Sequence, residues 1–152
     1  LNSIVAAQNG HRFIYRGMDV STDGNELAHA ILRGGVDKYG TTIPNYHYED
    51  IWRLSKMYKE KNLKNPAVIV DANHSNSNKQ HHEQLRIVGE VLHTRKYNAE
   101  LRNLIKGVMV ESYLVEGRQD IGSHMTYGQS ITDPCIGWED TVRLIDKIAE
   151  DC

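Results

Sequence analysis

The chain has 152 residues, 25% of them charged, and a formal net charge of −2 at pH 7. This length fits one domain with a moderate hydrophobic core, and the small negative charge provides no basic surface for nucleic acid. No apolar run approaches the roughly 18 residues that a membrane-spanning helix needs, so we expect neither a nucleic-acid nor a membrane partner.

Four segments are predicted to be strands: RFIY (12–15), AHAILRGG (28–35), PAVIVDA (66–72) and KGVMVES (106–112). The last three contain unbroken apolar runs, which are typical of parallel strands covered on both faces. The turn-forming run STDGNE (21–26) predicts an antiparallel excursion before the second strand.

Amphipathic helices are predicted over residues 48–61, 79–95 and 138–150, where apolar side chains recur every three or four positions. Ser77 or Asn78 is a candidate N-cap for the second helix. The last helix places Val142, Ile145 and Ile148 on its apolar face. Alternating strands and helices predict an α/β fold with a parallel sheet, either as a small open domain or as the last part of a barrel.

Polar side chains stand at the carboxyl ends of the predicted strands, where ligands collect in parallel α/β folds. Arg33 follows the second strand, Asp71 and His74 follow the third, and Glu111 ends the fourth. Asp133 lies in a polar loop before the last helix. Because these strand ends meet at one edge of the sheet, we expect the five side chains to form one site.

His74, Glu111 and Asp133 make a mixed imidazole and carboxylate set, which suits Mn, Fe or Zn. Asp71 is placed to orient the His74 ring. Structural interpretations of the same three residues remain open. His74 could be a hydrogen-bonded loop histidine, and the Glu111 carboxylate could be neutralised by an arginine or by a raised pKa. Asp133 could be the N-cap of the last helix. Arg33 offers a fork for phosphate or carboxylate, or a structural ion pair.

Five segments, in chain order, resemble the C-terminal part of 3-deoxy-D-arabino-heptulosonate 7-phosphate (DAHP) synthase, of the type regulated by aromatic amino acids. They are ILRGG (31–35), PNY (44–46), VDANHSNSNKQ (70–80), GVMVESYLVEGRQ (107–119) and YGQSITDPCIGWEDT (127–141). The resemblance implies strands six to eight of a TIM (β/α)8 barrel, as one partial-barrel unit over residues 1–152. It also implies a β-hairpin excursion over residues 11–27, which helps form the inhibitor pocket in that family.

The resemblance further implies a transferase that condenses phosphoenolpyruvate with erythrose 4-phosphate, the first step of the shikimate pathway of aromatic amino acid biosynthesis. Its cofactor is a divalent metal, and Mn, Fe, Zn and Co remain open. His74, Glu111 and Asp133 match three of the family's four metal ligands, and Arg33 matches a residue that binds phosphoenolpyruvate. His74 and Arg33 are therefore the expected catalytic and substrate-binding residues.

Two parts of the family pattern have no counterpart in the chain: a cysteine ligand near the first barrel strand and a Lys-Pro-Arg-Thr segment for erythrose 4-phosphate. Cys135 adjoins Asp133 and is not given the role of that cysteine. A first residue of Leu1 instead of Met also suggests a piece of a longer protein. We therefore expect the isolated chain to be inactive and to need the upstream part of the barrel.

Other partners and functions remain as alternatives. Leu32, Ile69 and Met109 would be poorly covered in three strand–helix units, so self-association into a homo-oligomer through an open sheet edge is expected. The two cysteines form no disulfide framework, which favours a cytoplasmic location. The alternatives to the transferase are a metal- or phosphate-binding module without turnover and a related synthase for another sugar phosphate.

Overall fold

The computed structural model describes residues 1–152, and at its centre is a three-stranded parallel sheet in the order β3–β6–β7. The strands are β3 (Ala30–Leu32), β6 (Val68–Asp71) and β7 (Ile105–Met109). Each was predicted as a strand, although each strand is shorter than the segment predicted for it. The α/β prediction with a parallel sheet is confirmed.

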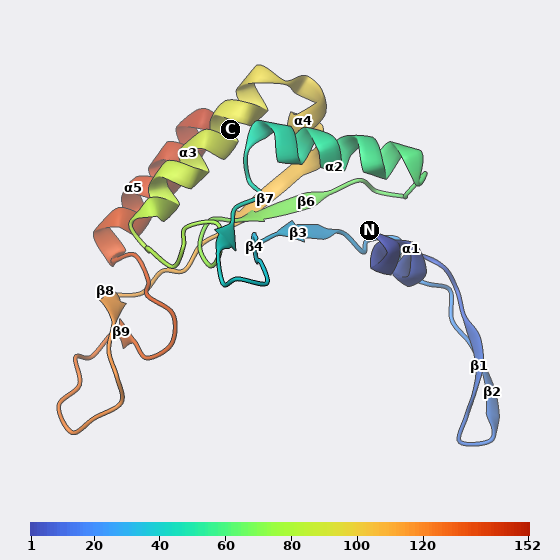
Figure 1. Ribbon diagram of the computed structural model, residues 1–152, viewed down its shortest axis with the longest axis horizontal. Helices are drawn as coiled ribbons and strands as arrows, with labels where there is room; N and C mark the ends of the chain where they lie inside the picture. Colours follow the sequence, from blue (N-terminus) through green and yellow to red (C-terminus); the bar gives the residue numbers. More distant parts are fainter.

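Four helices lie together on one side of this sheet (Figure 1). They are α2 (Tyr48–Glu60), α3 (Glu83–Tyr97), α4 (Ala99–Leu104) and α5 (Trp138–Asp151). The periodicity predicted α2 and α5 closely, placed the start of α3 too early, and missed both α4 and the N-terminal α1 (Asn2–Gln8). No helix combines the length and the apolar character required to cross a bilayer.

The sheet is covered on one face only. Val68 and Val70 point into the core beneath the helices and are 0% exposed. Ile31 and Met109 lie on the other face and are 49% and 40% exposed. Since side chains alternate between the two faces of a strand, and all the long helices lie on one side, the expectation of strands covered on both faces is wrong for this chain.

The register also corrects one residue of the predicted open face. Leu32 pairs with Val70, and it packs against the core on the helix side. Its neighbour Ile31 pairs with Ile69 and occupies the open-face position instead. The apolar run alone did not reveal this, because a shift of one residue exchanges the two faces of a strand.

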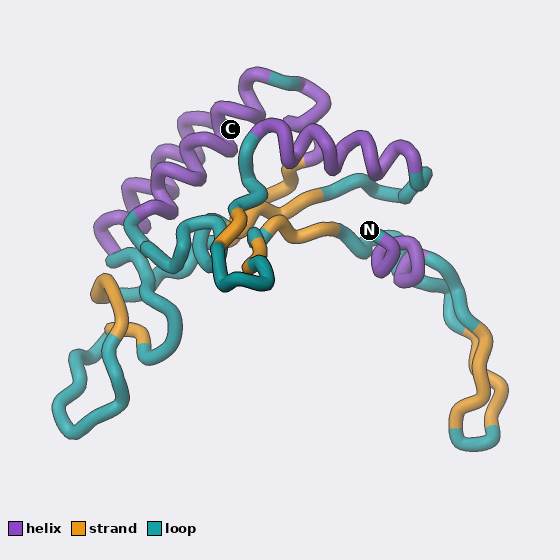
Figure 2. The backbone as a smooth tube through the Cα atoms, in the orientation of Figure 1, coloured by secondary structure: helices purple, strands orange, loops and turns teal.

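An antiparallel hairpin of β1 (Arg12–Tyr15) and β2 (Met18–Ser21) extends away from the sheet at one end of the molecule (Figures 1 and 2). Its base is fastened by Gln8, whose side chain is buried. The Gln8 amide donates to three backbone carbonyls and accepts from one backbone N–H; the partners are Glu26, Ala28 and Lys64. The hairpin is thereby tied to the loop before β6.

Short strands and one helix face were not predicted correctly. The strands β4 (Gly35–Val36), β5 (Thr42–Ile43), β8 (Val115–Arg118) and β9 (Gln129–Ser130) have two to four residues each, too few for a periodic signal. On α5, Ile145 is 56% exposed, whereas Leu144 is buried. Helix α5 packs against the core through Leu144 and the predicted Ile148, whereas Val142 and Ile145 of the predicted apolar face are exposed.

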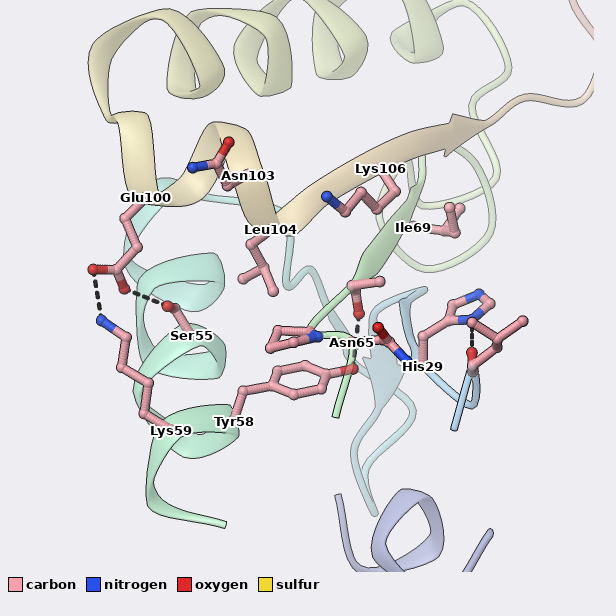
Figure 3. A pocket seen from close by; sticks show the side chains of 13 residues that line it. His29, Ser55, Tyr58, Lys59, Asn65, Ile69, Glu100, Asn103, Leu104 and Lys106 are labelled. Carbon is pink, nitrogen blue, oxygen red and sulfur yellow. Dashed lines mark hydrogen bonds and ion pairs between the residues drawn. The ribbon is translucent and has the colours of Figure 1, made fainter. Parts of the chain in front are cut away.

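Tyr58 joins the amino ends of two strands beside a groove of about 700 Å³ between α2, α4 and the sheet (Figure 3). Its hydroxyl accepts a hydrogen bond from the Ala30 N–H at 2.9 Å and donates one to the Ala67 carbonyl at 2.7 Å. The side chain is 1% exposed, and burial raises the pKa of the phenol above its usual value.

We predict that Tyr58→Phe lowers the free energy of unfolding by about 1–3 kcal/mol, because it removes both hydrogen bonds of the buried hydroxyl and leaves the Ala30 N–H and the Ala67 carbonyl only their mutual bond of 3.4 Å. Urea denaturation followed by circular dichroism measures the difference. Tyr127→Phe is the matched control, since the Tyr127 side chain is 89% exposed and its change should be close to zero. Equal effects of the two substitutions would contradict the bridging role of Tyr58.

Candidate metal centre

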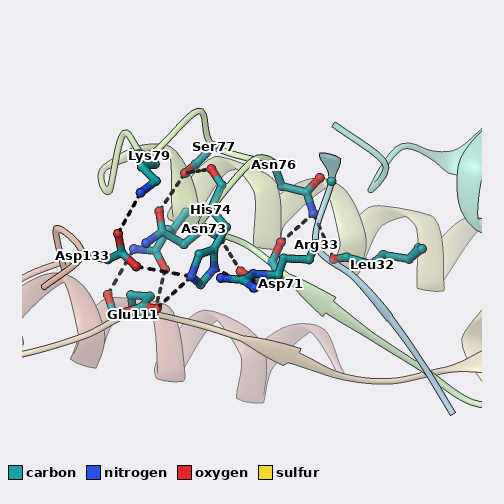
Figure 4. A network of polar contacts seen from close by, with 12 residues as sticks. Leu32, Arg33, Asp71, Asn73, His74, Asn76, Ser77, Lys79, Glu111 and Asp133 are labelled. Atoms are coloured by element: carbon teal, nitrogen blue, oxygen red, sulfur yellow. Dashed lines mark hydrogen bonds and ion pairs between the residues drawn. The ribbon is translucent and has the colours of Figure 1, made fainter. Parts of the chain in front are cut away.

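The polar residues predicted to share a site lie on the open face of the sheet, at the carboxyl ends of its strands. Arg33, Asp71 and Glu111 each come two residues after an apolar side chain of that face. The alternation of the strand therefore points all three toward the same side. Figure 4 shows them together with His74 and Asp133, which come from the loops that follow β6 and β9.

His74, Glu111 and Asp133 converge closely. The distance from His74 Nε2 to Glu111 Oε1 is 3.4 Å, and that to Asp133 Oδ2 is 3.5 Å. One potential ligand atom from each of the three residues lies within 4.8 Å of the others. No other three His, Cys, Asp or Glu side chains of the chain form such a group.

The spacing and chemistry of this set fit a divalent metal. Nitrogen and oxygen ligands lie about 2.0–2.2 Å from such an ion, which separates two ligand atoms by about 3–4 Å. The two distances from His74 Nε2 fall within that interval. An imidazole and two carboxylates are ligands for Mn, Fe, Co or Zn. The Glu111 and Asp133 carboxylates have ligand atoms within 4.8 Å of each other, and a bound cation would offset the repulsion between their negative charges.

Asp71 orients the imidazole of His74. Asp71 Oδ2 lies 2.8 Å from His74 Nδ1, and Asp71 Oδ1 accepts a hydrogen bond from the Asn73 N–H at 2.8 Å. The carboxylate is 1% exposed. A buried carboxylate favours the proton on Nδ1, which leaves the Nε2 lone pair facing Glu111 and Asp133.

Arg33 lies on the other side of the same carboxylate. Its Nε is 3.7 Å from Asp71 Oδ2, and its side chain is 60% exposed. The pair is longer than a hydrogen bond, so it is a weak ion pair. The guanidinium keeps most of its donors directed toward solvent, where they are available to an anion.

Asn76 connects the ends of the two strands that carry Arg33 and Asp71. Its amide donates to the carbonyls of Leu32 and Asp71, at 3.0 and 2.7 Å, and its Oδ1 accepts from the Asn45 N–H. The φ of Gly34 is +71°, and an added Cβ there would lie 2.8 Å from Ser75 Cβ. The glycine is thus required for the strand end to approach this loop.

The turn between His74 and α3 differs from the predicted helix start. Asn78 and Lys79 have φ values of 53° and 58°, in the left-handed region, and α3 begins only at Glu83. The Ser77 hydroxyl donates to Asn73 Oδ1 at 2.7 Å. The prediction of Ser77 or Asn78 as the N-cap is therefore wrong: Ser77 bonds within the turn, Asn78 Oδ1 accepts a hydrogen bond from the Thr42 hydroxyl, and the N-cap position of α3 is His82.

Lys79 is a site residue that sequence reasoning did not assign. Its Nζ lies 3.2 Å from Asp133 Oδ1, so a cation of the chain neutralises part of the charge of the cluster. The capping alternative for Asp133 is wrong, because the N-cap of α5 is Gly137. The sequence signal for the turn that places Lys79 here was the Asn- and Ser-rich run 73–78, because Asn and Ser side chains form turns by hydrogen bonding to the nearby backbone.

Cys135 borders the cluster without joining it. The thiol is buried, with Sγ 3.9 Å from Glu111 Oε2 and 3.4 Å from the Asp133 carbonyl. Burial raises the pKa of this thiol, and the charges of Glu111 and Asp133 raise it further. Cys135 is not part of the group of converging ligand atoms, which consists of His74, Glu111 and Asp133.

Comparison with known proteins gives a consistent family. Residues 1–146 match the profile described as the DAHP synthetase I family. A phospho-2-dehydro-3-deoxyheptonate aldolase of Haemophilus influenzae is 44% identical over 157 aligned positions, covering 99% of this chain and 41% of that protein. A Trp-sensitive phospho-2-dehydro-3-deoxyheptonate aldolase of Escherichia coli O6:H1 is 42% identical, over 93% of this chain and 37% of that protein.

The fold is also similar to a solved structure. The phospho-2-dehydro-3-deoxyheptonate aldolase of Francisella tularensis SCHU S4 superposes with a TM-score of 0.83 at 33% identity. The match covers 99% of this chain and 43% of that one. The chain thus spans about two fifths of the length of the relatives that it matches.

Proposed function

The chain belongs to the DAHP synthetase I family, and on that premise we propose that it forms part of a transferase of the shikimate pathway. The reaction condenses phosphoenolpyruvate with erythrose 4-phosphate and yields DAHP and phosphate. The observation that carries the proposal is the convergence of His74, Glu111 and Asp133 beside Arg33, at the carboxyl ends of parallel strands. These are the positions where α/β folds place their ligands.

We assign a role to each residue of the site. His74, Glu111 and Asp133 hold a divalent metal, and Asp71 keeps the His74 ring in its binding tautomer. When bound, the metal supplies a Lewis acid that polarises the aldehyde of the sugar phosphate. Arg33 binds phosphoenolpyruvate through charge-assisted hydrogen bonds and orients it beside the metal ligands.

The proposal also places the chain within a barrel. Strands β3, β6 and β7 correspond to strands six to eight of a TIM barrel, and the open face with Ile31 and Met109 is part of the barrel interior. The upstream part of the barrel covers that face and completes the site. Without it, a homo-oligomer formed through the unpaired edges of β3 and β7 would pair the free backbone groups of these strands and extend the sheet.

We predict that the isolated chain consumes no phosphoenolpyruvate when it is mixed with erythrose 4-phosphate and Mn²⁺, because the site lacks the groups expected from the upstream barrel. The decrease in the ultraviolet absorbance of phosphoenolpyruvate measures turnover, and a parallel sample with EDTA is the control. Light scattering of the same sample gives the mass of the species tested. Consumption that EDTA abolishes would show that the chain, alone or as an oligomer, already forms a complete site.

A second candidate function is a binding module without turnover. The extent of the open sheet face favours it, since this face leaves the candidate site accessible to solvent on one side. Such a module would bind Mn²⁺ or phosphoenolpyruvate in a calorimetric titration and would leave both unchanged. Turnover by the chain when the remainder of the barrel is supplied would exclude this function.

A further inference from the structure

Gln84 is a buried polar side chain whose partners all belong to one candidate metal ligand. It lies in the first turn of α3 and is 0% exposed. Its Nε2 donates to the Glu111 carbonyl at 3.1 Å, and its Oε1 accepts from the Glu111 N–H at 2.8 Å. The side-chain amide therefore bonds to both polar groups of the Glu111 backbone.

The two hydrogen bonds between the Gln84 amide and the Glu111 backbone take the place of a neighbouring strand. The parallel pairing of β7 with β6 ends at Met109, two residues before Glu111. Beyond that point the chain has no strand on the α3 side, and the Gln84 amide supplies the donor and the acceptor that a strand would provide. The Ile136 N–H donates to the same Glu111 carbonyl at 2.9 Å. This carbonyl therefore accepts two hydrogen bonds, one from Gln84 and one from Ile136.

The two bonds also determine the orientation of the amide. A rotation that exchanged Oε1 and Nε2 would place two donors face to face and two acceptors face to face. In a site closed to water neither mismatch can be relieved, so one orientation is strongly preferred. A rigid amide then transmits the position of α3 to the backbone from which the Glu111 carboxylate extends.

We propose that Gln84 is a positioning residue, which holds the Glu111 carboxylate at the distance from His74 that metal binding requires. The inference rests on the proposed function to the extent that Glu111 is a metal ligand. Gln84 itself is too deeply buried to contact a ligand, so it acts through the backbone of Glu111. Residues that orient a ligand in this way commonly change metal affinity by about 10–100-fold.

The test compares two substitutions that remove a buried amide. Gln84→Met keeps the approximate volume of the side chain and removes both hydrogen bonds. Gln8→Met is the matched control, because the Gln8 amide is also buried and bonded to backbone groups, but in the loops that hold the N-terminal hairpin. Titration with Mn²⁺ alone should give a Kd about 10-fold weaker for Gln84→Met and an unchanged Kd for Gln8→Met.

Hydrogen exchange provides a readout that needs no metal. The Glu111 amide should exchange at least about 10-fold faster in Gln84→Met, since it loses its acceptor, and should be unaffected in Gln8→Met. Should Gln84→Met fail to fold, Gln84→Asn makes the same comparison, because it keeps an amide and shortens its reach by one methylene.

Each outcome has one meaning. A weaker Kd and faster exchange confined to the Gln84 variant support the positioning role. Equal Mn²⁺ affinities of the unaltered chain and the Gln84 variant would overturn this inference and leave the metal site standing. Equal losses in both Gln variants would overturn it as a general effect of destabilisation. Failure of the unaltered chain to bind Mn²⁺ would remove both this inference and the metal site of the proposed function.

Discussion

His74→Ala is expected to weaken the binding of Mn²⁺ by at least about 100-fold. The loss of a residue that only orients a metal ligand costs about 10–100-fold in affinity, and the loss of a ligand itself should cost at least as much as the upper end of that range. His74 Nε2 is the atom that lies 3.4 and 3.5 Å from the two carboxylates. Its removal leaves Glu111 and Asp133 as two like charges without the neutral ligand between them. Isothermal titration of the purified chain with MnCl₂ measures the change.

The matched control for this substitution is His93→Ala. His93 lies on the exposed side of α3, where its ring stacks on that of Tyr97 with 6.4 Å between the centroids. It is remote from the cluster, so its replacement should leave the Mn²⁺ affinity unchanged. An equal affinity of the His74 variant and the unaltered chain would show that the three side chains lie together for another reason, such as a hydrogen-bonded polar network.

Asp71→Leu is expected to weaken Mn²⁺ binding by about 10–100-fold, although Asp71 is not a proposed ligand. The substitution removes the acceptor that lies 2.8 Å from His74 Nδ1, so the proton is no longer confined to that nitrogen. Asp71→Asn should have a smaller effect, because an amide oxygen can still accept from Nδ1–H but carries no charge. Titration with Mn²⁺ should give the lowest Kd for the unaltered chain, a higher Kd for Asp71→Asn and the highest Kd for Asp71→Leu.

Asp19→Asn is the control for the Asp71 substitutions. Asp19 is a hairpin carboxylate paired with Arg12, which holds the pKa of that carboxyl below its usual range. Its removal alters charge without touching the site, so the affinity for Mn²⁺ should not change. If Asp71→Leu and Asp19→Asn bind Mn²⁺ equally well, the orientation of His74 does not depend on the Asp71 carboxylate.

Local patterns in the sequence were sufficient for the main elements of the fold. The apolar runs around Val70 and Val108 predicted strands, and the spacing of Ile51, Leu54 and Tyr58 predicted α2. These predictions succeeded because the burial of one face imposes a short repeat on the chain. The polar residues that end the strands followed from the same argument, since parallel strands bring their carboxyl ends to one edge.

Other features had no periodic signal. The turn at Asn78 and Lys79 depends on left-handed backbone conformations, and the apolar spacing that predicted a helix from residue 79 could not register them. Helix α4 has six residues and begins at the Asn98 side chain, which accepts hydrogen bonds from the N–H groups of Glu100 and Leu101. Six residues complete fewer than two turns, so hydrophobic periodicity cannot identify such a helix.

The sequence by itself determined the three strands of the central sheet, the three long helices and the residue types available for a metal and an anion. The tertiary structure decided which sheet face stays open, because that depends on the side to which every helix crosses over. It also decided that Gln84 meets Glu111 and that Lys79 meets Asp133, pairs separated by 27 and 54 positions. Contacts between residues so far apart in the sequence arise from the packing of whole helices and strands, which no local pattern encodes.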